Sequence, residues 1–247
     1  MKINKIFKKI LATTLAVATL CGGINNFRGN ITANAVSNPV QMYNMDYSFY
    51  RYGIYQYTVY IQVDSKSAAN KAVYVHHATN DGWTDTAASF FMKLDDNTEI
   101  WKAYISGVST NEYAIKYVGD GQTYWDNNNG NNYTLSNVAG ASNVKAIRRS
   151  PSVSYNCIRA VVNNLGNEKK VIIRYTLDNW VSFREAELSY VSSVPGTNEE
   201  LWAVQLNDLV PDNVDSFQYC IRYEVNGQTY WDNNFGSNYD YNYYRSY

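Results

Sequence analysis

The stretch QTYWDNN occurs twice in this chain, as residues 122–128 and again as residues 228–234. Both copies continue through a glycine to Asn-Tyr, giving YWDNNNGNNY at 124–133 and YWDNNFGSNY at 230–239. An internal repeat is the first feature to seek in a sequence, because missing it misassigns the whole fold. The repeat predicts a chain made of two similar units.

The tryptophans follow the same repeat. All six fall three to a copy and in the same order: Trp83, Trp101 and Trp125, then Trp180, Trp202 and Trp231. The spacing between equivalent residues grows in small steps along the chain, as insertions in surface loops would produce. We therefore predict two domains, at 36–140 and 144–247, each of a size that can fold alone. A short polar stretch joins them.

Both units read as β-structure. Apolar and polar residues alternate in YQYTVYIQV (55–63), EYAIKYV (112–118), KKVIIRY (169–175) and FQYCIRYEV (217–225), which is the period of half-buried strands. Tight hairpin turns are expected at Asp120-Gly121 and at the matching Asn226-Gly227, because such turns need positive φ. The predicted fold is all-β, with two tandem immunoglobulin-like antiparallel β-sandwich domains.

The N-terminus has the features of a targeting segment. Four lysines precede the apolar run at 10–20, and the small-residue site Ala33-Asn34-Ala35 follows. A basic start, a short apolar core and an A-x-A end are typical of a secretory signal peptide. The sequence thus predicts a signal peptide at 1–35 and a secreted, extracellular protein with no membrane anchor after cleavage.

Composition excludes several classes of protein. Aromatic residues make up 15% of the chain, far above what disordered chains carry, and the formal net charge of −1 does not suit a nucleic-acid partner. Two histidines and three cysteines leave little for a metal site, and no cofactor is expected. For Cys157 and Cys220, a disulfide and two buried thiols are both open alternatives.

Each copy places tryptophans beside an asparagine-rich loop. The apolar face of a sugar ring can lie flat on a large, rigid indole. A carboxamide both donates and accepts hydrogen bonds, as neighbouring sugar hydroxyls do. Neither feature is specific alone, but their joint duplication indicates a site for a neutral sugar in each unit.

Three features together resemble family 21 carbohydrate-binding modules. They are the strand leading to a tryptophan, the later strand IKY (115–117) or IRYEV (221–225), and the loop YWDNNxGxNY. These starch- and glycogen-binding β-sandwiches also occur in glycogen-targeting phosphatase subunits. The resemblance covers both copies, and copy 2 matches it better. It implies binding of α-1,4-glucans through stacked aromatic rings and asparagine side chains.

Carried over residue by residue, the resemblance implies four stacking aromatics and four amide contacts. These are Trp83, Trp125, Asn127 and Asn132 in the first copy, and Trp180, Trp231, Asn233 and Asn238 in the second. The family often has another aromatic residue 11 positions before the loop tryptophan, where this chain has Ala114 and Cys220. A second family site depends on a tyrosine, and Ala69 and Asn167 stand in its place.

Plainer roles compete for the same residues. Trp101 and Trp202 lie among alternating apolar residues and are expected in the core. The loop asparagines could instead form the turn, since asparagine tolerates the left-handed conformation. We expect Asp126 and Asp232 to accept backbone hydrogen bonds within their own loops. Neither loop has the glycine and glutamate spacing of an EF-hand.

Catalysis is not expected, because a glycosidase needs two carboxylates and each copy repeats a single one near its site. The sequence therefore predicts a secreted, non-catalytic protein that binds starch, glycogen or a related α-glucan, with starch-degrading proteins as possible partners. The alternative is a protein-interaction or surface-assembly module on the same sandwich. A phosphatase-targeting role is disfavoured by the predicted export and by the lack of a recognisable docking motif.

Overall fold

The computed structural model describes residues 38–49, 55–106, 112–147, 157–210 and 216–240. In these ranges the regular structure is β-strand, apart from three short 3₁₀ turns: η2 (Asn128–Gly130), η3 (Gly140–Ser142) and η4 (Leu206–Asp208). The predicted all-β fold is confirmed. The predicted signal peptide at 1–35 lies outside the described residues. No helix in the described part is long and apolar enough to cross a membrane.

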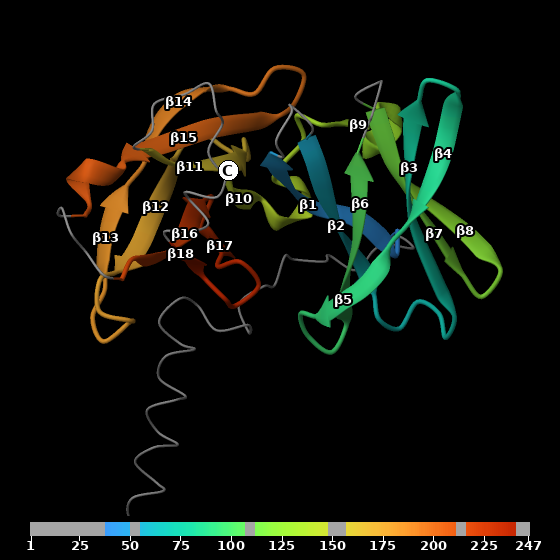
Figure 1. Ribbon diagram of the computed structural model, residues 1–247, viewed down its shortest axis with the longest axis horizontal. Coiled ribbons are helices and arrows are strands. Elements are labelled where there is room, and N and C mark those ends of the chain that lie inside the picture. Colours follow the sequence, from blue (N-terminus) through green and yellow to red (C-terminus); the bar gives the residue numbers. More distant parts are fainter. Residues whose placement is uncertain (1–37, 50–54, 107–111, 148–156, 211–215, 241–247) are drawn as a thin grey trace, which may run out of the picture.

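The first half of the chain forms two antiparallel sheets (Figure 1). One has the order β1-β2-β6-β5, and the other has the order β4-β3-β7-β8 with β9 also paired to β7. Their bounds are β1 (Val40–Phe49), β2 (Tyr55–Asp64), β3 (Lys71–Thr79), β4 (Gly82–Ala87), β5 (Ser89–Lys93), β6 (Thr98–Ser106), β7 (Glu112–Gly119), β8 (Gln122–Asp126) and β9 (Tyr133–Thr134).

The second half repeats this arrangement strand for strand, in the orders β10-β11-β15-β14 and β13-β12-β16-β17 with β18 paired to β16. Figure 1 shows the two halves next to each other, the second in yellow to red. Its strands are β10 (Val144–Ile147), β11 (Cys157–Asn163), β12 (Lys169–Thr176), β13 (Arg184–Glu187), β14 (Ser189–Ser193), β15 (Glu199–Gln205), β16 (Gln218–Val225), β17 (Gln228–Asp232) and β18 (Tyr239–Asp240).

Each half has its own apolar core between its two sheets. Alternation along β3 explains how: Val73 and Val75 are buried, while Tyr74 and His76 face outward. Trp101 and Trp202 are partly buried and pack against the cores of their halves. The core of a sandwich thus fixes which strand residues remain on the outer face.

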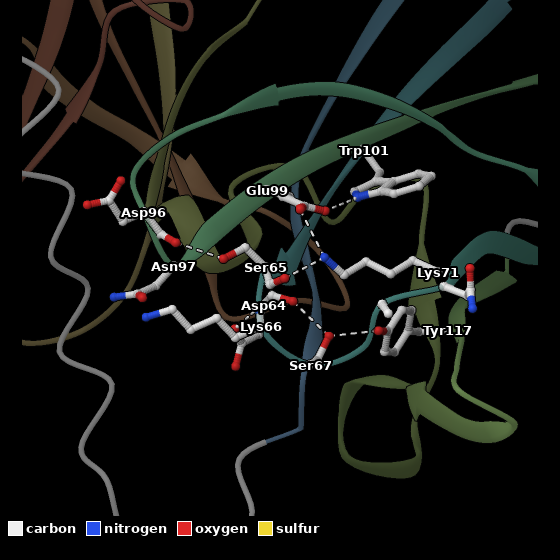
Figure 2. A network of polar contacts seen from close by, with 12 residues as sticks. Asp64, Ser65, Lys66, Ser67, Lys71, Asp96, Asn97, Glu99, Trp101 and Tyr117 are labelled. Carbon is white, nitrogen blue, oxygen red and sulfur yellow. Dashed lines mark hydrogen bonds and ion pairs between the residues drawn. The ribbon is translucent and has the colours of Figure 1, made fainter.

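A buried polar bridge crosses each sandwich from one sheet to the other. In the first half, Lys71 Nζ on β3 lies 2.9 Å from Glu99 Oε1 on β6 and donates to the Ser65 carbonyl, and Trp101 Nε1 donates to Glu99 Oε2 (Figure 2). Lys169, Glu200 and Trp202 repeat this bridge in the second half, with Lys169 Nζ 2.9 Å from both oxygens of Glu200.

The loop after β17 fastens the second half to the first. Phe235 packs against an aromatic cluster on the first half, with ring-centroid distances of 5.9 Å to Tyr43, 4.8 Å to Tyr60 and 5.2 Å to Phe91. The equivalent residue of the first-half loop is the exposed Asn129. The aromatic ring of Phe235 is therefore what allows the second-half loop to pack on the other half, and the first-half loop has no such ring.

Glu199 supports the same junction with hydrogen bonds. Its carboxylate accepts from the backbone N–H groups of Val138 and Ala139, at 2.9–3.0 Å, and only 4% of the residue is exposed. Asn163 Nδ2 adds a bond of 2.7 Å to the Gly140 carbonyl. The two halves thus meet through both apolar and polar contacts.

We expect Phe235→Ala to lower the free energy of unfolding by about 1–3 kcal/mol, because it removes a half-buried aromatic ring and leaves space beside Tyr60. Urea denaturation followed by tryptophan fluorescence would measure this change. Phe183→Ala is the matched control, since Phe183 is in the same half, is 40% exposed and does not contact the junction cluster. Equal effects of the two variants would contradict the role given to Phe235.

Candidate functional site

The outer face of the sheet β4-β3-β7-β8 carries the two predicted tryptophans of the first half. Trp83 lies on β4 opposite Ala78, and Trp125 lies on β8 opposite Lys116. Trp83 is 44% exposed and Trp125 is 43% exposed, which are high values for so large a side chain. The structure therefore places both indoles on one accessible surface.

His76 joins the two indoles. Its ring stacks on Trp83, with centroids 5.0 Å apart and an interplanar angle of 18°, and it meets Trp125 edge-on at 5.2 Å. Ala114 is the cross-strand neighbour of His76 and presents only a methyl group beside it. We refer to Trp83, His76 and Trp125 as the aromatic platform.

Polar contacts fix the platform from one side. Asp85 accepts hydrogen bonds from His76 Nδ1 at 2.7 Å and from Lys116 Nζ at 2.6 Å. Partial burial raises the pKa of Asp85, but the hydrogen bonds and charges of Lys116 and His76 outweigh burial and hold this pKa below its usual value. Lys116 also lies 5.8 Å from the Trp125 ring centroid. The negative charge of Asp85 is thus balanced by Lys116 next to the rings.

The two predicted asparagines of the first half are partly used by their own loop. Asn127 Oδ1 accepts from the Gly130 N–H at 3.0 Å, and Asn132 has a positive φ of 57°. Asn132 Nδ2 donates to Glu112 at 3.2 Å. Asn127 Nδ2 and Asn132 Oδ1 make no hydrogen bond to the described residues. One polar atom of each carboxamide thus remains open to a ligand.

Asp126 and Asp232 accept backbone hydrogen bonds within their own loops, as expected, from the N–H groups of Asn128 at 3.4 Å and Asn234 at 3.2 Å, and each makes further bonds. Asp126 accepts from the Met42 N–H and the Tyr133 hydroxyl, each at 2.7 Å. Asp232 accepts in the same way from the Ala146 N–H and the Tyr239 hydroxyl. The bonds from Met42 and Ala146 tie the loops after Trp125 and Trp231 to the first strand of each half.

The second half brings Trp180 and Trp231 together, but in a different environment. Trp180 is only 6% exposed and packs with Cys220 against Trp231. Its Nε1 donates to Gln218 Oε1 at 2.7 Å. Trp180 is therefore covered, unlike its first-half counterpart Trp83. Cys157 and Cys220 carry thiols and do not form a disulfide.

Two guanidinium groups flank Trp231. Arg174 lies 4.9 Å and Arg222 lies 5.5 Å from the ring centroid, and both bind Glu185. Phe183 lies on Arg174 at 4.4 Å. Arg174 occupies the sequence position of His76, so this position contacts the loop tryptophan in both halves. The second site is more polar and less open than the aromatic platform.

Asn233 and Asn238 lie in the loop that forms the junction. Asn233 is 5% exposed, and its Oδ1 accepts from the Gly236 N–H. Asn238 Oδ1 is buried and has no hydrogen-bond partner among the described residues. Asn233 is therefore less accessible than its exposed counterpart Asn127, whereas Asn238 and Asn132 are both half-buried.

Sequence reasoning missed the roles of His76 and Phe235. His77, the next residue of β3, faces the core, where it is 5% exposed and bonds to Thr86. His76 is not repeated in the second copy, which has Arg174 at this position, so the repeat did not single it out. The alternation of apolar and polar residues along β3 was the signal that could have placed His76 on the outer face, where Trp83 lies.

Comparison with known proteins identifies the second half. Residues 154–242 match the family model described as carbohydrate/starch-binding module (family 21). This part of the chain is a family 21 module. The match covers one module, so a tandem of two is not shown, although the first half has the same sheet order.

The relatives are regulatory and starch-binding proteins. The chain is 38% identical over 81 residues to protein phosphatase 1 regulatory subunit 3C of Bos taurus, covering 32% of this chain and 25% of that protein. It is 34% identical over 90 residues to GLC7-interacting protein 2 of Saccharomyces cerevisiae, covering 33% and 16%. The starch-binding domain of Rhizopus oryzae glucoamylase, solved with β-cyclodextrin and maltoheptaose, is 30% identical, with 42% of this chain and 97% of that chain covered and a TM-score of 0.34.

These relatives correct the predicted location. Regulatory subunits of protein phosphatase 1 are intracellular proteins, so the prediction of a secreted, extracellular protein is wrong. The prediction of secretion rested on the basic and apolar N-terminus, which lies outside the described residues. The comparisons support carbohydrate binding, and binding modules of this kind fit a non-enzyme.

Proposed function

We propose that this protein binds α-1,4-glucans, such as starch or glycogen, and that the aromatic platform is its main contact. The observation that carries the proposal is the pair of exposed indoles held on one face by His76. Successive glucose units have apolar faces that suit such a surface, and the open atoms of Asn127 and Asn132 would meet their hydroxyl groups. The family 21 match in the second half supports the same ligand class.

We propose a smaller contribution from the second half. Trp180 is covered, and the arginines beside Trp231 are held by Glu185. Trp180, Trp231, Asn233 and Asn238 would then form a weaker contact with the same polymer. Two linked sites still raise the overall affinity when both can engage one chain.

Trp125→Ala and Trp83→Ala are each expected to weaken binding of maltoheptaose by roughly 5- to 30-fold, since removing one stacking ring costs about 1–2 kcal/mol. Isothermal titration calorimetry measures the dissociation constant, and affinity electrophoresis in amylopectin gels gives an independent test. Trp231→Ala is expected to have a smaller effect.

Phe90→Ala is the matched control for these variants. Phe90 is a first-half aromatic that is 51% exposed, but it belongs to β5 in the other sheet. Binding by Phe90→Ala should equal that of the unaltered protein. The proposal fails if unaltered protein migrates freely through amylopectin, or if Trp125→Ala binds as well as Phe90→Ala.

We also propose domain boundaries at 36–140 and 144–247. The strands β1 to β9 and β10 to β18 support this division, because each set forms two sheets around its own core, although the first core extends to Val161 of the second half. The first domain would then be a second carbohydrate-binding module that has diverged beyond the family model.

The relatives favour a protein partner as a second candidate function. They are named as regulatory subunits of protein phosphatase 1, but this chain spans a quarter or less of the two relatives named above. Exposed apolar side chains at Val181, Tyr190 and Val191 in the second half support a protein contact. Titration with purified protein phosphatase 1 catalytic subunit, with and without maltoheptaose, tests it: absence of binding in both cases would exclude this function.

A further inference from the structure

A polar groove of about 660 Å³ lies between the two halves of the molecule. The first half lines it with the loop after β8 and the segment before η3, and the second half lines it with the end of β11 and the β14–β15 turn. The side chains that matter here are Asn128, Asn131, Asn137, Asn163, Asn198 and Glu199. Both halves are needed to form this groove.

Three carboxamides in the groove each use one of their two polar atoms in a hydrogen bond to the backbone. Asn163 Nδ2 donates to the Gly140 carbonyl at 2.7 Å, and Asn198 Nδ2 donates to the Asn164 carbonyl at 3.2 Å. Asn137 Oδ1 accepts from the Thr134 N–H at 2.8 Å. The other polar atom of each of these three carboxamides has no hydrogen bond to the described residues. The groove thus presents oriented donors and acceptors that carry no charge.

The one charged side chain among the described residues that line the groove is Glu199. Its carboxylate is used by the backbone N–H groups of Val138 and Ala139. Glu199 therefore acts as part of the junction and leaves the groove suited to a neutral, hydroxyl-rich ligand.

The groove borders the same loop that follows Trp125. Asn132 turns toward Glu112 on the platform sheet, whereas Asn128 and Asn131 line the groove. Asn131 and Asn132 are consecutive residues, so the two sets of asparagines adjoin along the chain. A polymer that leaves the aromatic platform over this loop would reach the groove within a few sugar units.

We infer that the groove between the halves is an extension of the glucan site, which holds by hydrogen bonds the glucose units beyond those stacked on the platform. This inference rests on the proposed glucan binding and adds the groove residues to it. Short oligosaccharides that occupy only the platform do not reach the groove, whereas longer ones engage both. Chain length therefore separates the two contributions.

The test uses the full chain with the double substitution Asn131→Ala and Asn198→Ala. Both residues are exposed, one comes from each half, and neither makes a contact on which the fold depends. Loss of their hydrogen bonds should weaken maltoheptaose binding by roughly 5- to 20-fold. Maltotriose binding should change less than about 2-fold. Calorimetric titration measures both ligands, and circular dichroism verifies the fold.

Ser237→Ala is the matched control, because Ser237 is the exposed second-half equivalent of Asn131 and does not line the groove. The inference is overturned if the unaltered protein binds maltoheptaose and the double variant binds it equally well, or if the variant loses both ligands equally. If the unaltered protein binds neither ligand, the proposed function itself fails, and this inference with it.

Discussion

Glu200→Ala is expected to lower the free energy of unfolding by about 3–5 kcal/mol, the usual cost of breaking a buried ion pair by removing one partner. The side chain of Lys169 is only 8% exposed, and Glu200 is its ionic partner in the polar bridge. The substitution leaves the Lys169 ammonium without its carboxylate and the Trp202 N–H without its acceptor. Equilibrium urea denaturation measures the change.

Glu187→Ala is the control for this prediction. Glu187 also pairs with a lysine in the second half, Lys170, but the side chains of this pair are 67% and 62% exposed. An exposed pair contributes about 0–1 kcal/mol. Comparable losses in Glu187→Ala and Glu200→Ala would show that burial does not make the polar bridge important for stability.

The stability of the protein is expected to fall by about 3 kcal/mol as the pH rises from 4.5 to 7, because of Glu199. Burial raises the pKa of Glu199 from 4.5 to about 7, although hydrogen bonds from Val138, Ala139 and Gly140 oppose this shift. Between these two pH values the folded protein holds a proton that the unfolded chain has released. Raising the pH therefore favours unfolding, and the contribution is complete above pH 7.

Urea denaturation at several pH values tests this dependence. Glu199→Gln cannot titrate, so the decline assigned to Glu199 should disappear in this variant. Glu187→Gln, at an exposed position, should retain it. A decline of the same size in Glu199→Gln and in the unaltered protein would show that another group is responsible.

The sequence predicted the strands and the hairpin turns well, because these depend on local patterns. The alternating stretch 55–63 falls within β2, and Asp120 and Asn226 have the positive φ that their turns require. Asn-Gly and Asp-Gly have few other conformations available in so short a connection. Local rules were therefore enough for the strands and turns, whereas the order of the strands in each sheet was not predicted.

The environment of each site could not be predicted in the same way. Trp83 and Trp180 occupy equivalent places in sequence, yet one is exposed and the other is covered. The difference arises because the backbone of Trp180 adopts a positive φ of 69° after β12, which allows its ring to pack on Cys220. Such a contact depends on residues far apart in the sequence, and the alternation within one strand does not predict it.

The contact made by Phe235 is directional, because the second half supplies the ring and the first half supplies the aromatic cluster that receives it. Strand pairing places Ile147, Arg159 and Val191 in the second half where the first half has its aromatic cluster of Tyr43, Tyr60 and Phe91. A further copy added after the second would thus find no aromatic receptor for its own loop. Asn129 likewise gives the first copy no anchor for an upstream neighbour. Assembly by this contact stops at two units.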